Sequence, residues 1–247
     1  MSGYANLASY YGALFPVSEA CRRFLAPCAS FCSTRQLPWL DVGCGVGNLV
    51  EWLRAEGVDA HGVEPDADFV AEARRRLDDE AGVRIRQGAL NSALGMFDGV
   101  VWGGVSCLGN VLAHAASQDE IADFLSNCAR AMAPGGVVVL QVVNYDKVLS
   151  AKEWTFPVLR RQAPDGMPLV FRRKYDLEGW KPGDRIVFET ELDAGERTIW
   201  NQTRLLPLRR DDLVRLVRTV FERYRVFGDF SGVDWTPDGP ATILIGG

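Results

Sequence analysis

The chain contains a short apolar segment that passes through three closely spaced glycines into a segment with helical character. Residues 37–42 are mostly apolar, Gly43, Gly45 and Gly47 follow, and an apolar run begins at Leu49. Glycine is expected where a tight strand-to-helix turn needs positive φ, or where a ligand approaches the backbone. The free amides of a helix N-terminus suit the polar end of a nucleotide-like cofactor. A ligand-free loop is the alternative, because glycines also punctuate ordinary turns.

A second buried strand is predicted over residues 59–64, ending in the carboxylate of Glu64. An ionised carboxylate offers only acceptors and has two oxygens, so it can receive both hydroxyls of an adenosine ribose. The alternative is that Glu64 caps the helix that follows, a role that Asp66 could fill instead.

Composition excludes several functional classes. The 247 residues are 47% hydrophobic, which supports one large domain or a core with an insertion. The net charge of -5 argues against nucleic-acid binding. The longest strongly apolar stretch, Val137–Val143, has the length of a strand, so we expect neither export nor a membrane span. Six cysteines without C-x-x-C pairs and two histidines predict no metal site, and a cytoplasmic location is expected.

Strands and helices alternate through the first part of the chain. This alternation predicts an α/β fold with a doubly wound, mostly parallel, Rossmann-like sheet covered on both faces. The ligand crevice of such a sheet lies at the carboxyl ends of its strands. Besides the two strands above, the predicted elements are helices Phe69–Leu77 and Gln118–Met132, and strands Val83–Arg86, Phe97–Val101 and Val137–Val143.

Three motifs resemble one family of enzymes. The run Asp41–Gly47 resembles the D-x-G-x-G-x-G element of class I S-adenosylmethionine-dependent methyltransferases, whereas the dinucleotide pattern would need a glycine at Asn48. Cys107–His114 and Leu140–Leu149 look like the CLGN and NYD stretches of glycine and sarcosine N-methyltransferases and their relatives. The similarity covers residues 35–150.

The resemblance implies S-adenosylmethionine as cofactor and a set of residues that bind it. In such enzymes a tyrosine-bearing lead helix closes over the cofactor, which places Tyr11 against the sulfonium, where a cation–π contact would form; core packing of Tyr11 is the alternative. Asn144, from the NYD element, is expected in the substrate pocket, and His114 or Tyr145 could accept a proton. The remaining expected cofactor residues are Asp41, Gly43, Cys44, Gly45, Gly47, Glu64 and Pro65, with adenine near Ala89 and Leu90.

After residue 150 the alternation stops. Leu169–Tyr175, Arg185–Leu192 and Arg197–Leu205 read as strands of an antiparallel meander separated by turn signals. We expect a cofactor-binding core with its lid helix over residues 1–151, a substrate roof over 152–205 and completion of the core over 206–247, including a helix Asp212–Tyr224. A dimerisation sheet, and hence a homodimer, is the alternative for the meander.

Basic residues on the meander are candidate anion partners: Arg172, Arg173, Lys174 and Arg204. Most charged strand residues face water. In the enzymes that the chain resembles, the point where this strand returns to the core adjoins the cleft. The resemblance therefore implies that Arg204 is a substrate ligand, whose guanidinium could bind a carboxylate with two hydrogen bonds.

These features predict methyl transfer from S-adenosylmethionine to a small molecule, with an amine nitrogen as the acceptor atom. An in-line displacement of this kind needs mainly alignment of a neutral nucleophile and exclusion of water. The sequence leaves two alternatives open. One is an O-methyltransferase acting on a phenol or sugar, and the other is a nonenzymatic nucleotide-binding module or a dinucleotide oxidoreductase.

Overall fold

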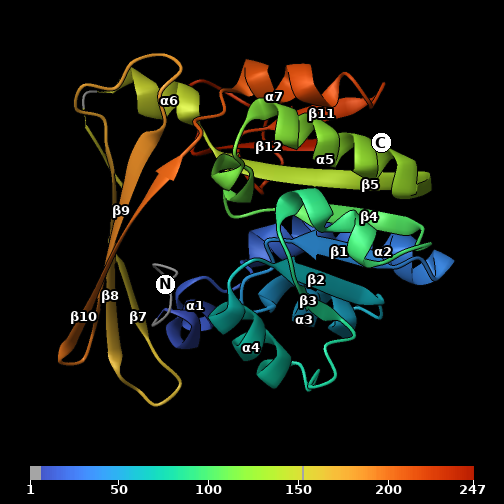
Figure 1. Cartoon of the computed structure of the whole chain (residues 1–247), viewed down its shortest axis with the longest axis horizontal. Helices are drawn as coiled ribbons and strands as arrows, with labels where there is room; N and C mark the ends of the chain where they lie inside the picture. Colours follow the sequence, from blue (N-terminus) through green and yellow to red (C-terminus); the bar gives the residue numbers. More distant parts are fainter. Residues whose placement is uncertain (1–6, 152) are drawn as a thin grey trace.

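The larger of two β-sheets forms the core of the molecule (Figure 1). The computed structural model describes residues 7–151 and 153–247. The core strands are β1 (Trp39–Val42), β2 (Ala60–Glu64), β3 (Ile85–Gln87), β4 (Trp102–Cys107), β5 (Met132–Val143), β11 (Tyr224–Phe227) and β12 (Ala241–Gly246). Their order is β11-β12-β5-β4-β1-β2-β3. Strands β1 to β5 pair in parallel, while β12 is antiparallel to β5 and to β11. The predicted fold class is confirmed.

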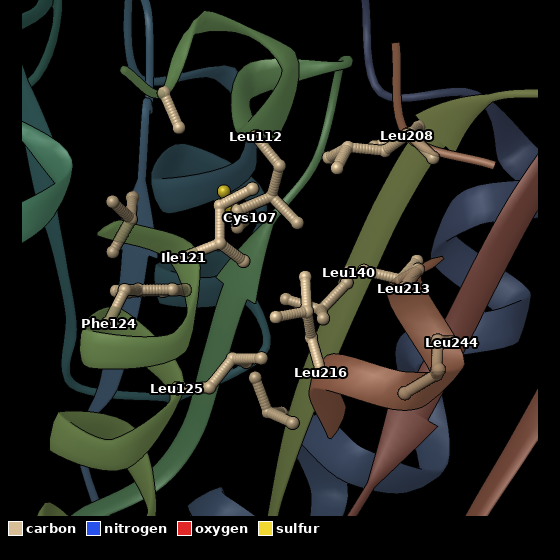
Figure 2. Packing of buried hydrophobic residues seen from close by; sticks show 14 of the residues in the cluster. Cys107, Leu112, Ile121, Phe124, Leu125, Leu140, Leu208, Leu213, Leu216 and Leu244 are labelled. Carbon is tan, nitrogen blue, oxygen red and sulfur yellow. The ribbon is translucent and has the colours of Figure 1, made fainter. Parts of the chain in front are cut away.

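Helices cover both faces of this sheet. Helices α2 (Glu19–Arg35), α3 (Asn48–Ala55) and α4 (Ala67–Arg76) pack on one face, and α5 (Gln118–Ala131) and α7 (Arg210–Val217) on the other. Successive residues of a strand point to opposite faces. Accordingly, Val139 of β5 packs in the hydrophobic cluster under α2, α3 and α4. Its neighbour Leu140 packs on the opposite face with Phe124 of α5 and Leu213 of α7 (Figure 2). Burial on both sides explains why residues 137–143 of β5 are apolar except for Gln141.

The second sheet is antiparallel and lies within residues 154–205. Its strands are β6 (Trp154–Thr155), β7 (Leu159–Gln162), β8 (Pro168–Asp176), β9 (Ile186–Ala194) and β10 (Arg197–Leu205). In Figure 1 these strands stand beside one end of the core sheet, joined to β5 by α6 (Tyr145–Ser150), with α1 (Ala8–Leu14) near their base. Phe171 and Leu192 pack against Leu14, whereas Ile186 joins the core cluster. Both ends of the second sheet are therefore fixed to the core.

The fourth core strand begins later than predicted. The sequence favoured Phe97–Val101, but β4 spans Trp102–Cys107 and contains Gly103 and Gly104. A Cβ atom at Gly103 would lie 2.6 Å from Leu37, and one at Gly104 would lie 2.3 Å from the ring of Trp39. Glycines that normally indicate a loop are required here by the close packing of neighbouring side chains.

The last helix is shorter than predicted. Helix α7 ends at Val217 rather than continuing to Tyr224, and i to i+3 backbone bonds then form a turn at Thr219 and Val220. The chain must reverse at this point because Tyr224–Phe227 forms β11 beside β12. Tertiary pairing of an edge strand thus overrides the helical spacing of the apolar residues.

Candidate active site

Three glycines form the turn between β1 and α3. Gly43, Gly45 and Gly47 have φ values of 76°, 55° and 80°, in the left-handed region that favours glycine. The amides of Gly43 and Cys44 donate to the carbonyl of Val63, with N···O distances of 2.7 and 3.1 Å. These bonds fix the turn to the end of β2.

The carboxylate of Glu64 lies directly beside this turn. Its Oε2 accepts a hydrogen bond from the amide of Gly45 at 3.0 Å, and its Oε1 accepts one from the amide of Asp66 at 3.1 Å. Burial raises the pKa of Glu64, and the two backbone donors oppose that shift. Asp66 caps α4 through Asp68 and Phe69, so the capping role considered for Glu64 belongs to Asp66.

A cavity of about 630 Å³ extends from the glycine turn to the second sheet. We call the lining contributed by the core its floor and the lining contributed by the second sheet its roof. The floor includes Gly43, Gly45, Glu64 and Pro65. The roof consists of Phe156, Phe171, Arg173, Tyr175, Phe188 and Thr190.

Tyr11 closes one side of the cavity. It lies on α1 and lines the cavity, with its ring centroid 4.9 Å from that of Phe69 and 4.8 Å from that of Phe15. A Cβ at Gly45 would lie 3.3 Å from the Tyr11 ring. The lead helix therefore packs directly over the glycine turn.

The other predicted cofactor residues are not part of the cavity lining. Asp41 accepts a 2.6 Å hydrogen bond from the Ser106 hydroxyl, which in turn accepts one of 2.9 Å from the indole N–H of Trp39. Burial raises the pKa of Asp41 to about 7. Five predicted cofactor residues are absent from the described residues that line the cavity: Asp41, Cys44, Gly47, Ala89 and Leu90.

A network of hydroxyl and amide groups connects floor and roof. The Asn110 side-chain nitrogen donates to the hydroxyls of Tyr145 at 2.9 Å and Tyr175 at 3.5 Å, and the two hydroxyls lie 3.3 Å apart. Burial raises the pKa of Tyr145 to about 12 and also raises that of Tyr175. Tyr145 is fully buried behind Tyr175, so it is poorly placed for the predicted role of proton acceptor.

His114 lines the cavity at the end of the 3-10 helix η3 (Val111–His114). Burial by the surrounding protein and the positive charge of Arg185 lower the pKa of its imidazole. The neutral form is therefore favoured at pH 7, which is the form that can accept a proton.

The side chain of Asn144 does not have the arrangement predicted for it. Only 1% of the residue is exposed, and its nitrogen lies 3.0–3.1 Å from the carbonyl oxygens of Thr236, Pro237 and Gly239. Its side-chain oxygen caps α6. These bonds hold the segment before β12 against the end of β5, so the expectation that Asn144 binds substrate is corrected to a structural role.

Arg204 is also placed differently from the prediction, because it faces away from the cavity. It pairs with Val187 on β9, whereas the roof residues Phe188 and Thr190 are one and three positions further along that strand. Since side chains alternate between faces, Arg204 lies on the exposed face. Arg173 occupies the inner face instead. Residues two apart in a strand share a face, so the aromatic residues Phe171 and Tyr175 place Arg173 on the inner face with them. This alternation was the signal in the sequence that favoured Arg173.

The comparisons with known proteins agree with this geometry. A family model described as a methyltransferase domain matches residues 40–138. Residues 40–138 thus match a methyltransferase domain, and the chain shares its fold with S-adenosylmethionine-dependent methyltransferases. Residues of this domain form β1 to β4, the glycine turn and Glu64. The cofactor of the domain's family is S-adenosylmethionine, rather than the dinucleotide of the alternative considered above.

One curated relative and two solved structures show how far the likeness extends. The ubiquinone biosynthesis O-methyltransferase of Rhodopseudomonas palustris (strain TIE-1) is 29% identical over 131 residues, which are 51% of this chain and 47% of the relative. The chain thus matches only about half the length of that relative.

The solved structures share the fold over nearly the whole chain. An S-adenosylmethionine-dependent methyltransferase from Clostridium acetobutylicum has a TM-score of 0.69 at 13% identity, covering 92% of this chain and 91% of that one. The SAM-bound amino pentose methyltransferase CalS10 from Micromonospora echinaspora has a TM-score of 0.61 at 19% identity, covering 93% and 92%. The narrower resemblance to glycine and sarcosine N-methyltransferases stays a prediction.

Two kinds of feature are absent from the part of the chain that the structure describes. No cluster of three or more His, Cys, Asp or Glu side chains able to hold a metal ion occurs among them. Within the same part of the chain, no helix is both long and apolar enough to cross a membrane.

Proposed function

We propose that the chain transfers the methyl group of S-adenosylmethionine to a small-molecule acceptor, and that the acceptor atom is an amine nitrogen. The proposal rests on one observation, namely that the same cavity is lined by the glycine turn, by Glu64 and by the aromatic residues of the roof. A cofactor at the floor and an acceptor under the roof would share this space, as an in-line displacement requires.

The residues at the floor fit the cofactor. Each oxygen of Glu64 receives one backbone N–H and keeps a second lone-pair direction for a ribose hydroxyl. Pro65 and Phe69 provide apolar walls beside it. When bound, the cofactor supplies an activated methyl group, and Tyr11 and the roof exclude water from the site of transfer.

An amine acceptor must be neutral to act as a nucleophile. The positive charge of Arg173 disfavours an ammonium ion close to it, although the acidic Glu64 and Asp66 also line the cavity. The proton released after transfer can pass to the imidazole of His114 or to solvent. CalS10, which shares the fold, is described as an amino pentose methyltransferase.

A hydroxyl acceptor is the second candidate, and His114 is the observation that favours it. A phenol or sugar hydroxyl must lose its proton as the methyl group arrives, and a neutral imidazole at the cavity wall could accept it. The relative from Rhodopseudomonas palustris is an O-methyltransferase by name.

Two measurements test the proposal. S-adenosylhomocysteine should raise the melting temperature of the protein, whereas NAD should not. Radiolabelled S-adenosylmethionine is then incubated with separate sets of amines, phenols and sugars. Labelled amines would support the first candidate and labelled phenols or sugars the second. Absence of any shift with S-adenosylhomocysteine would contradict both.

A further inference from the structure

One row of polar residues crosses the inner face of the roof. Arg173 on β8 pairs with Thr190 on β9, and Thr190 pairs with Asn201 on β10. In the next row on the same face, Phe171 on β8 pairs with Leu192 on β9, and both side chains are buried. Directly opposed residues have Cβ atoms about 5 Å apart, so the three polar side chains adjoin one another.

Arg173 is a half-buried cation that forms no ion pair with a carboxylate among the described residues. Its Nε is buried and has no hydrogen-bond partner there, and its Nη2 reaches only the carbonyl of Pro157 at 3.5 Å. Burial lowers the pKa of its guanidinium. The guanidinium carbon lies 4.8 Å from the ring centroid of Phe156 and 5.7 Å from that of Phe171. Aromatic faces compensate only part of the cost of burying a charge.

The two basic residues on either side of Arg173 have different surroundings. Arg172 binds Glu191 at 2.7 Å and Asp193 at 2.6 Å, and Lys174 binds Glu189 at 2.7 Å. Both face the exposed side of the sheet. The inward residue of the three therefore lacks the carboxylate that each outward residue has, and it is the one that lines the cavity.

The tyrosine pair adds a second donor beside Arg173. Asn110 donates to both hydroxyl oxygens, and one tyrosine donates to the other. Tyr145 is fully buried, so a proton left unpaired on its hydroxyl would be costly. Either hydroxyl can donate to the other. When Tyr145 is the donor, the hydroxyl hydrogen of Tyr175, which lines the cavity, is available to a ligand.

The remaining polar atoms of the row are also able to donate. The side-chain nitrogen of Asn201 is buried and has no hydrogen-bond partner among the described residues. Thr190 lines the cavity and presents a hydroxyl. The guanidinium of Arg173, the hydroxyl of Tyr175 and these two groups give one face of the roof a cluster of groups able to donate.

We propose that the acceptor carries a carboxylate, which binds Arg173 with the Tyr175 and Thr190 hydroxyls as further donors, and that its body is planar and apolar. This inference rests on the proposed function, because it assigns the acceptor of the same cavity. A carboxylate matches the planar guanidinium and carries one negative charge for one cation. The rings of Phe156 and Phe188 line the space beside it and suit a flat apolar group.

The test compares two probes that have nearly the same shape and differ in charge. Benzoate and benzamide are titrated into the protein saturated with S-adenosylhomocysteine, and affinities are measured by calorimetry. We expect benzoate to bind at least about tenfold more tightly than benzamide, as for a hydrogen-bonded charged group. Arg173→Gln should abolish this preference, and Tyr175→Phe should reduce benzoate affinity about threefold or more. Arg204→Gln on the exposed face is the matched control and should retain the full preference.

The outcomes separate this inference from the proposed function. Equal affinities for benzoate and benzamide in the wild-type protein, or no binding of benzoate, would overturn the carboxylate site while leaving the cofactor site intact. A preference that persists in Arg173→Gln would overturn it too. Failure of the wild-type protein to bind S-adenosylhomocysteine would instead contradict the proposed function. Unchanged affinity of Arg173→Gln for S-adenosylhomocysteine shows that this variant is folded.

Discussion

The floor and the roof of the cavity differ in what they present to a ligand. The floor is largely backbone: glycines with positive φ, amide groups, and the carboxylate of Glu64 fixed by two amides. The roof is almost entirely side chain, with aromatic rings around Arg173. A backbone site tolerates few substitutions and suits a ligand that does not vary, whereas each side chain of the roof can be exchanged alone. The comparison supports our proposal that the floor binds the cofactor and the roof selects the acceptor.

The largest expected effect is at the floor, where Gly45→Val should reduce affinity for S-adenosylhomocysteine at least about 100-fold. A β-branched residue is strained by about 1–3 kcal/mol at positive φ, and its side chain would also extend toward Tyr11 and the ligand space. Calorimetry measures the affinity. Gly95→Ala is the control, because a Cβ there meets no atom within 4 Å and should change nothing. Normal affinity of Gly45→Val would place the cofactor elsewhere.

A somewhat smaller effect is expected for Glu64→Ala, which should weaken S-adenosylhomocysteine binding by about 1.5–3 kcal/mol, the usual contribution of a charged hydrogen-bonding group. The variant also releases the amides of Gly45 and Asp66, so Glu64→Gln should lose less. The exposed Glu56→Ala serves as the control for removing one negative charge. Unchanged affinity in Glu64→Ala would show that this carboxylate does not contact the cofactor.

The support beneath the floor should be visible in the pH dependence of stability. The pKa of Asp41 is raised to about 7 in the folded protein from an ordinary value of 3.8. Between these values the folded state holds the proton more strongly than the unfolded state. The free energy of unfolding should therefore fall as the pH rises through this interval, by up to about 2 kcal/mol between pH 5 and pH 7.

Asp41→Asn tests this dependence, because an amide keeps an oxygen for the Ser106 hydroxyl and has no proton to lose. Urea unfolding at several pH values should give a flatter profile for the variant than for the wild-type protein. Identical profiles would mean that Asp41 does not control this part of the stability curve.

The difference between floor and roof also explains what the sequence could predict. The glycine turn and Glu64 were identified because strand, turn and helix are consecutive in the chain, and local spacing specifies their geometry. Strand β4 was misplaced because Gly103 and Gly104 are required by contacts with Leu37 and Trp39, which lie more than sixty residues away in the sequence. Local propensity has no access to such contacts.

The antiparallel sheet of the roof was predicted from the sequence. The residue facing the cavity was predicted only from its place at the end of the last strand. Arg204 was chosen for its position in the chain, and the register with β9 places it outside, whereas Arg173 lies inside. Strand alternation contains this information only once a cavity is known to lie on one face. Asn144 failed for a different reason, since its three carbonyl partners come from residues 236–239, which no local pattern connects to it.

The smallest expected effect belongs to Tyr145, which stands behind the roof rather than in it. Its hydroxyl has a pKa of about 12, so a phenolate is not available near pH 7 to accept a proton. Tyr145→Phe removes one hydrogen-bond partner from Tyr175 and one acceptor from Asn110, which should raise KM for the acceptor about 2–10-fold with little change in kcat. The measurement is a set of steady-state rates between pH 6 and pH 9, once an acceptor has been found. A positioning role leaves the pH profile of kcat unchanged, whereas a proton acceptor would alter it. Loss of kcat together with a shifted pH profile would restore Tyr145 as the base and make it, rather than the roof, the decisive part of the acceptor site.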